Sequence, residues 1–119
     1  TVARKHHELR VWQEAMALVK AVYLATTAFP REERFGLTAQ MRRSAVSVPS
    51  NIAEGPARAT RKEFLHFLAV ARGSLSELDT QVRIAIHLDF LPNDSGLTRQ
   101  IDKIFGVLGA LMKSQAVMR

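Results

Sequence analysis

Residues 60–87 read TRKEFLHFLAVARGSLSELDTQVRIAIH, and this stretch decides the fold class. Its apolar residues recur at alternating spacings of three and four, the period of a helix that buries one face. The resulting seam consists of Leu68, Ala71, Leu75, Leu78, Val82 and Ala85. Thr60 and Glu63 have the spacing of a capping box, in which two side chains satisfy free amides at a helix start. The stretch therefore predicts one long helix that starts at Thr60 and closes near Leu91-Pro92.

Three further segments carry the same helical period. The first covers roughly residues 8–28 and ends at Phe29-Pro30, because the residue before a proline is disfavoured in the α region. The second covers roughly residues 37–57, and the last starts after the cluster at residues 93–95. The positions expected to face inward are Leu9, Trp12, Met16, Val19 and Tyr23 in the first, Leu37, Met41, Ala45, Val48 and Ile52 in the second, and Leu97, Ile101, Ile104, Leu108 and Leu111 in the last.

The helical period and the short connections predict one all-α domain over residues 1–119. Short connections favour antiparallel neighbours, which gives an antiparallel up-down-up-down four-helix bundle. Hydrophobic residues make up 47% and charged residues 24% of the chain, as in an ordinary globular protein. No stretch reaches the about 20 apolar residues that a membrane span needs. We therefore expect a cytoplasmic protein that does not bind membranes.

Several residues inside the predicted helices call for a structural reason. Pro49 removes a backbone donor and clashes with the carbonyl of Ala45, so we expect the helix over residues 37–57 to be kinked at Pro49. Gly73 costs about 1 kcal/mol relative to alanine inside a helix. We expect the close approach of a neighbouring backbone to compensate for that cost. Asn51 and Glu54 lie on a helix that otherwise faces inward, and the sequence leaves open whether they link helices or subunits.

The helix over residues 8–28 carries a second apolar stripe. It consists of Val11, Ala15, Leu18 and Val22 and lies about 110° around the helix from the first stripe, at about 100° per residue. A helix at the surface of a monomer needs only one apolar stripe. Deep burial within the bundle is one explanation. The other, which we favour, is that this second stripe forms the interface of a homo-oligomer.

Positive charge is concentrated in the first half of the chain. Seventeen Lys and Arg residues against eleven Asp and Glu residues give a net charge of +6. Residues 1–62 carry all of this excess, because residues 63–119 hold as many acidic as basic side chains. In an up-down bundle the N-terminus, the connection around residues 55–63 and the C-terminus share one end, which would be strongly basic. Such an end suits a polyanion, since each neutralised phosphate releases counterions.

We therefore predict binding to nucleic acid through cationic side chains that neutralise phosphates. The predicted binding residues are Arg4, Lys5, Arg42, Arg43, Arg58, Arg61 and Lys62. The sequence contains no zinc-finger spacing and no RNP-like aromatic run, so binding should tolerate sequence and depend on salt. The alternative is a protein-interaction adaptor whose basic end docks an acidic or polymerase-like partner.

Enzymatic motifs are absent, and we expect no catalytic residue, no cofactor and no metal. The chain has no cysteine, no glycine-rich phosphate loop and no HExxH. His66 and His87 lie about 31 Å apart along one helix at 1.5 Å per residue, so they cannot share a metal. Arg61 and His66 have an Arg-x4-His spacing that resembles the motif of the HEPN ribonucleases. In such a motif the histidine could move a proton and the arginine could stabilise a phosphorane. A HEPN-like ribonuclease that uses Arg61 and His66 is therefore a third hypothesis. The alternative is that His66 is an ordinary residue on the polar face of its helix.

The most specific segments are EERFGLT at residues 32–38 and QMRRSAVSVPSNIAEG at residues 40–55. They closely resemble the bacterial four-helix-bundle proteins first noticed in intervening sequences of large-subunit (23S) ribosomal RNA genes. Shorter matches occur at residues 9–13, 62–64, 73–75 and 77–78, so the resemblance spans nearly the full chain.

This resemblance implies a small bundle that assembles as a ring-like homopentamer and has no established enzymatic activity. A relative is the accessory protein of diversity-generating retroelements, a basic pentamer that associates with a reverse transcriptase and nucleic acid. The implied role is an accessory protein that binds RNA or other nucleic acid, with a reverse transcriptase or another protein as partner. One departure is Pro56, which stands where small or polar residues are usual and could reshape the loop that carries Arg58.

Overall fold

The computed structural model describes residues 9–58 and 60–117, and the described residues form helices without strands. The four long helices are α1 (Arg10–Thr26), α2 (Leu37–Glu54), α3 (Arg61–His87) and α4 (Leu97–Val117). Two short 3-10 helices, η2 (Arg31–Glu33) and η3 (Gly55–Ala57), lie in the connections. The all-α four-helix bundle predicted from the sequence is thereby confirmed.

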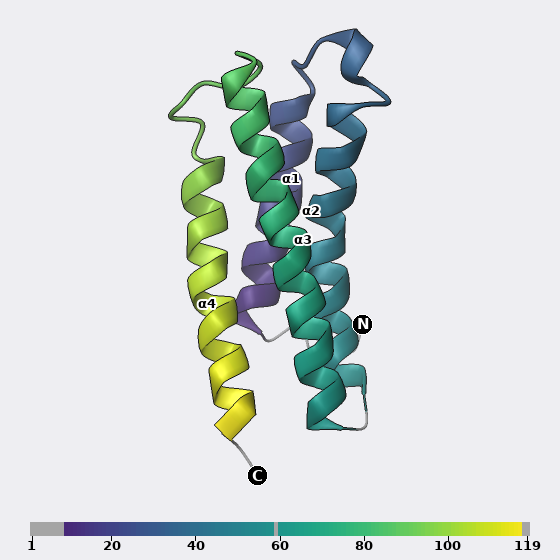
Figure 1. The fold of residues 1–119 in the computed structure, drawn as a ribbon, viewed down its shortest axis with the longest axis vertical. Helices are drawn as coiled ribbons and strands as arrows, with labels where there is room; N and C mark the ends of the chain where they lie inside the picture. The colour runs from purple at the N-terminus through teal and green to yellow at the C-terminus, as the bar shows by residue number, and fades with distance from the viewer. Residues whose placement is uncertain (1–8, 59, 118–119) are drawn as a thin grey trace.

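Consecutive helices run in opposite directions, and each packs beside its neighbour in the sequence (Figure 1). α1 and α4 are also in contact, so the four helices surround one core, and the contact between α2 and α3 is the most extensive. The α2–α3 connection lies at the same end of the bundle as the end of α4 (Figure 1). None of the helices in the described part of the chain is both long enough and apolar enough to cross a membrane.

The predicted seams of α2 and α3 form the core. Every residue of the two predicted seams is buried, and in α4 Leu97, Ile101, Ile104 and Leu108 are buried as well. Leu111 is half-buried and packs against this cluster. One apolar stripe per helix was enough to identify the inward face of these three helices.

The fully buried stripe of α1 is the second one, which was predicted to form a subunit interface. Val11, Ala15, Leu18 and Val22 have exposed fractions of 0–1% and belong to the core of the single chain. The prediction that they form a subunit interface is therefore wrong, because side chains already buried within one chain cannot contact another. The first stripe is divided: Leu9, Trp12 and Val19 are half-buried and pack against the core, whereas Met16 is 46% and Tyr23 41% exposed.

The close backbone approach expected at Gly73 is absent. A Cβ placed at Gly73 would meet no atom within 4 Å, whereas one at Gly55 would lie 2.6 Å from Cδ1 of Phe64. The prediction for Gly73 is therefore wrong, and the crowded glycine is Gly55, which is buried beneath the Phe64 ring.

α2 continues through Pro49 to Glu54, so the proline does not end the helix, and the kink stays a prediction. The polar residues around the proline bond mostly within α2. The Ser50 hydroxyl donates to the Val46 carbonyl at 2.7 Å, and the Asn51 amide donates to the Ser47 carbonyl at 2.8 Å. Ser47 and Ser74 share a hydrogen bond of 2.7 Å that joins α2 to α3. Asn51, which also donates to the Ser47 hydroxyl, thus belongs to a polar link between helices.

Candidate nucleic-acid interface

Three of the predicted phosphate-binding residues fall together at one end of the bundle. Arg58 follows η3, and Arg61 and Lys62 are the first two residues of α3, so the three cations lie within a span of five positions. We call Arg58, Arg61 and Lys62 the cationic cluster. Arg4 and Lys5, predicted to join them, lie outside the described residues.

Arg42 and Arg43 do not belong to this cluster. They lie in the second turn of α2, about 18 Å along the helix axis from Glu54 at 1.5 Å per residue. The Arg42 Nε donates to Oγ1 of Thr26 at 2.9 Å, and its Nη2 donates to the Tyr23 carbonyl at 3.3 Å. The same guanidinium lies 4.5 Å from the centroid of the Tyr23 ring. Arg42 therefore ties α2 to α1, and of the predicted binding residues that the structure describes, Arg58, Arg61 and Lys62 are the ones that lie at the α2–α3 connection.

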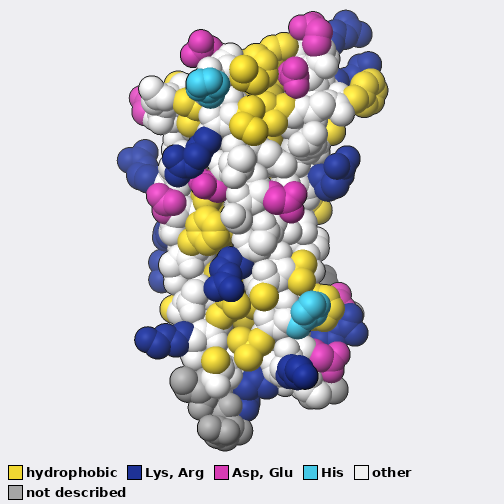
Figure 2. Space-filling model, viewed as in Figure 1, with side chains coloured by type: hydrophobic (Ala, Val, Ile, Leu, Met, Phe, Trp, Pro, Cys, Tyr) yellow, Lys and Arg dark blue, Asp and Glu magenta, His cyan; other side chains and the backbone are white. Residues whose placement is uncertain are grey.

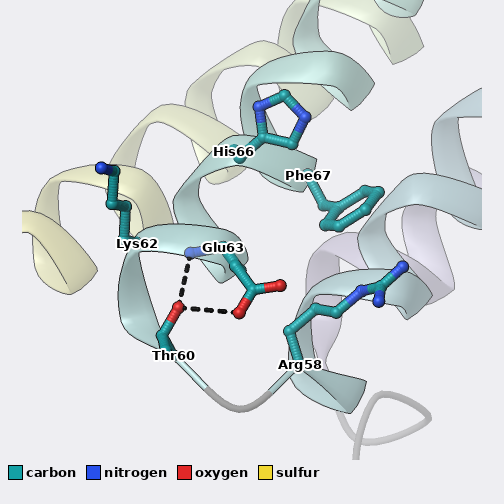
Figure 3. Close-up of a pocket in the computed structure, with 6 residues that line it drawn as sticks. All are labelled: Arg58, Thr60, Lys62, Glu63, His66 and Phe67. Carbon is teal, nitrogen blue, oxygen red and sulfur yellow. Dashed lines mark hydrogen bonds between the residues drawn. The ribbon is translucent and has the colours of Figure 1, made fainter.

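A cavity of about 630 Å³ lies at the start of α3 (Figure 3). Its lining residues are Arg58, Thr60, Lys62, Glu63, His66 and Phe67. Thr60 and Glu63, two of these lining residues, form the capping box predicted from the sequence. The Glu63 amide donates to the Thr60 hydroxyl at 3.1 Å. The Thr60 hydroxyl in turn donates to Oε1 of Glu63 at 3.1 Å. The cap fixes the direction of the first turn and hence the positions of Lys62 and His66.

Arg58 is held in place by two contacts. Its Nη2 lies 2.6 Å from Oε1 of Glu54, and its guanidinium carbon lies 4.7 Å from the centroid of the Phe67 ring. The Arg58 side chain nevertheless remains 40% exposed. A guanidinium fixed between a carboxylate and an aromatic ring loses little conformational freedom when a ligand binds, because its rotamer is already selected.

Charge at this end is positive but partly compensated. The described residues near the α2–α3 connection and the end of α4 include four cationic side chains and two carboxylates. The cations are Arg58, Arg61, Lys62 and Lys113, and the carboxylates are Glu54 and Glu63. The opposite end has two cationic side chains, Arg31 and Arg34, and four carboxylates, Glu32, Glu33, Asp89 and Asp94. Most acidic side chains visible in Figure 2 accordingly lie in its upper half. Among the described residues, the end with the α2–α3 connection is therefore the one with net positive charge.

The Arg-x4-His pair does not converge on the cavity. His66 lines the cavity and its ring lies 5.2 Å from the Phe67 ring in an edge-on arrangement, but Arg61 is not a lining residue. Five positions along a helix correspond to a turn of about 140°. The two side chains therefore leave α3 in different directions, which gives the ribonuclease hypothesis no geometric support. Within residues 9–58 and 60–117, no group of three or more potential metal ligands occurs.

A second surface lies between α1 and α2. Its cavity of about 340 Å³ is lined by Trp12, Met16, Val19, Val46, Pro49, Ser50 and Ala53. We call it the α1–α2 groove. Six of its seven lining residues are apolar, and Val46, like Met16, is substantially exposed, at 41%. The sequence analysis missed this groove because it assigned the α1 side of it to the core.

Two residues of the site, Glu54 and Phe67, were not predicted from the sequence. Glu54 lies four positions before Arg58, a spacing that favours an ion pair on a continuous helix and could have revealed the contact. Phe67 is next to Leu68 and off the core seam, and an aromatic residue at such a position is a weak sign of a surface role. Its contact with Arg58 depends on the path of η3, which the sequence did not predict.

Comparisons with known proteins agree with this fold. A family model described as 23S rRNA-intervening sequence protein matches residues 7–110. A crystal structure from Bacteroides thetaiotaomicron, described as a protein of unknown function from the S23 ribosomal protein family, superposes with a TM-score of 0.78 at 20% identity. The match covers 87% of this chain and 98% of that one. A search of curated proteins finds no match.

Proposed function

The chain belongs to the 23S rRNA-intervening sequence protein family, and from this premise we propose that it is a non-enzymatic, self-associating bundle that binds RNA through its cationic cluster. The observation that carries the proposal is the placement of Arg58, Arg61 and Lys62 within five positions at one end of the bundle. Neutralised phosphates release counterions, so this placement favours a nucleic-acid backbone over a neutral ligand. An accessory role beside a reverse transcriptase or another protein is compatible with such a module.

Self-association is supported by the α1–α2 groove. Apolar side chains that line a groove and remain partly exposed gain free energy when a second apolar surface covers them. Assembly would present several cationic clusters to one RNA, and each linked contact raises the apparent affinity without any new type of interaction. A homopentamer, which the family resemblance implies, would carry five such clusters.

Charge reversal tests the RNA-binding part of the proposal. The variant combines Arg58→Gln, Arg61→Glu and Lys62→Glu, and acidic residues in the first turn of α3 favour the helix, so folding should survive. The control makes the same total charge change with Arg43→Gln, Arg31→Glu and Arg99→Glu, three exposed positions away from the cluster. We expect the first variant to lose RNA binding in fluorescence anisotropy while the control retains most of it, even though the control includes Arg43, which the sequence predicted to bind but which lies away from the cluster. Equal losses in both variants would show that only net charge matters.

The second candidate is a protein-interaction adaptor. Two observations favour it: Arg58 is already paired with Glu54, and the α1–α2 groove offers an apolar surface. An adaptor that recognises its partner through that groove would bind with little dependence on salt, because apolar contacts are not screened. Retention of a protein partner at high salt, together with no RNA binding at low salt, would favour the adaptor.

A further inference from the structure

The cavity at the start of α3 combines charge with a stacking surface. We propose that Arg58 and Phe67 form a platform for one unpaired RNA base, so that the site prefers single-stranded RNA to duplex RNA. This inference rests on the proposed function, because the ligand is again RNA at the cationic cluster. It adds which form of RNA is bound and which side chains recognise it.

The geometry of Arg58 is the first support. Its guanidinium carbon lies over the Phe67 ring, 4.7 Å from the ring centroid, and its Nη2 lies 2.6 Å from Oε1 of Glu54. Because 40% of the side chain stays exposed, a ligand can still reach it. Figure 3 shows Arg58 and Phe67 on one side of the capping box and Lys62 on the other. The platform is therefore formed before any ligand arrives.

The chemistry of this surface fits an unpaired base. Guanidinium planes and aromatic rings stack well on nucleobases, which are available in single strands but already stacked inside a duplex. The cavity volume of about 630 Å³ lies within the range of small-ligand sites. Lys62 lines the cavity from the other side of the capping box and supplies a cation for a phosphate of the same RNA.

Charge alone does not explain a site here. Glu54 balances Arg58, and the Glu63 carboxylate also lines the cavity, so the cavity itself carries little net charge at neutral pH. The backbone amide of Glu63 is already bonded to Thr60 and is not available to an anion. The affinity for RNA at Arg58 and Phe67 must therefore come largely from stacking. The other residues of the cluster contribute through charge, by contacts with phosphates.

The test uses two conservative substitutions with matched controls. Arg58→Lys keeps the charge but removes the planar guanidinium, and Arg72→Lys makes the same change at an exposed position farther along α3. Phe67→Leu removes the ring but keeps apolar bulk, and Phe105→Leu makes the same change in α4. Binding of a short single-stranded RNA and of a blunt duplex of equal length is measured by anisotropy, with thermal unfolding as the folding control.

We expect the wild-type protein to bind the single strand about tenfold more tightly, the size of one base–aromatic stack. Arg58→Lys and Phe67→Leu should each remove most of this preference by weakening single-strand binding, whereas the two controls keep the preference. Equal wild-type affinity for both RNAs, or a preference that survives both substitutions, overturns the inference and leaves the proposed function intact. Binding to neither RNA overturns the proposed function and the inference together.

Discussion

Single residues in this bundle have roles that differ even where the residue type is the same. Gly55 is buried against the Phe64 ring, while Gly73 lies in an exposed part of α3 with open space around it. Arg42 is bonded to Thr26 and Tyr23 of α1, while its neighbour Arg43 is exposed. Residues of one type therefore differ in role because their surroundings differ: Arg42 is used to join two helices, whereas Arg43 is exposed to solvent.

The two glycines give a matched pair of stability predictions. Gly55→Ala would place a Cβ 2.6 Å from Cδ1 of Phe64, so the ring must move, and we expect a loss of about 1–3 kcal/mol. Gly73→Ala meets no atom within 4 Å and should stabilise the protein by about 0.5–1 kcal/mol, because alanine favours the helix. Urea unfolding measures both changes. A Gly55→Ala protein as stable as the wild type would mean that the ring has room to move.

At the scale of the helices, what the sequence could predict depended on how many apolar stripes a helix carries. α2, α3 and α4 have one stripe each, and for each of them the predicted inward face is the observed one. α1 has two stripes of the same period, and only packing against α2 and α4 decides which one is buried. The fully buried stripe contains the compact residues Val11 and Ala15, whereas the other stripe includes the exposed Met16 and Tyr23.

The candidate site was predictable to a similar extent. The capping box at Thr60 and Glu63 involves neighbours in sequence, so its spacing was enough to predict it. The bonds from Arg42 to α1 join residues 16 and 19 positions apart and depend on how two helices pack, which periodicity does not reveal. The cap was therefore predicted from its spacing, whereas the bonds between α1 and α2 were not.

The cap of α3 gives a prediction at the scale of the element. Thr60→Ala removes the hydroxyl that accepts from the Glu63 amide, and we expect a loss of about 1 kcal/mol of stability. Thr80→Ala, at an exposed position in the middle of the same helix, should be neutral or slightly stabilising. Chemical denaturation of both variants checks the difference. Similar stability for the two would show that the cap contributes nothing measurable.

At the scale of the whole molecule, the two candidate surfaces are separate and can be tested separately. The α1–α2 groove is lined by apolar side chains, and the cationic cluster lies at the α2–α3 connection. A contact between subunits through the groove would not involve the residues of the cluster. Assembly and RNA binding are thus expected to respond to different substitutions.

Self-association should be sensitive to charge in the groove. Met16 and Val46 are both partly exposed there, so Met16→Glu combined with Val46→Glu should leave the fold intact and disfavour burial against a second subunit. We expect a shift to lower mass in sedimentation equilibrium. Leu24→Glu, on the same helix but outside the groove, is the control and should keep the wild-type mass. An unchanged mass in the double variant would place the subunit contact elsewhere.

RNA binding by the cationic cluster is tested most directly by the salt dependence of affinity. The logarithm of the affinity for single-stranded RNA should fall linearly with the logarithm of the salt concentration, with a slope of about 0.7 per phosphate neutralised. In a variant with Arg58, Arg61 and Lys62 all changed to Gln, the loss of up to three such contacts should reduce that slope by about 2. A slope identical to that of the wild-type protein would contradict the account, because the phosphates would then be bound by other residues.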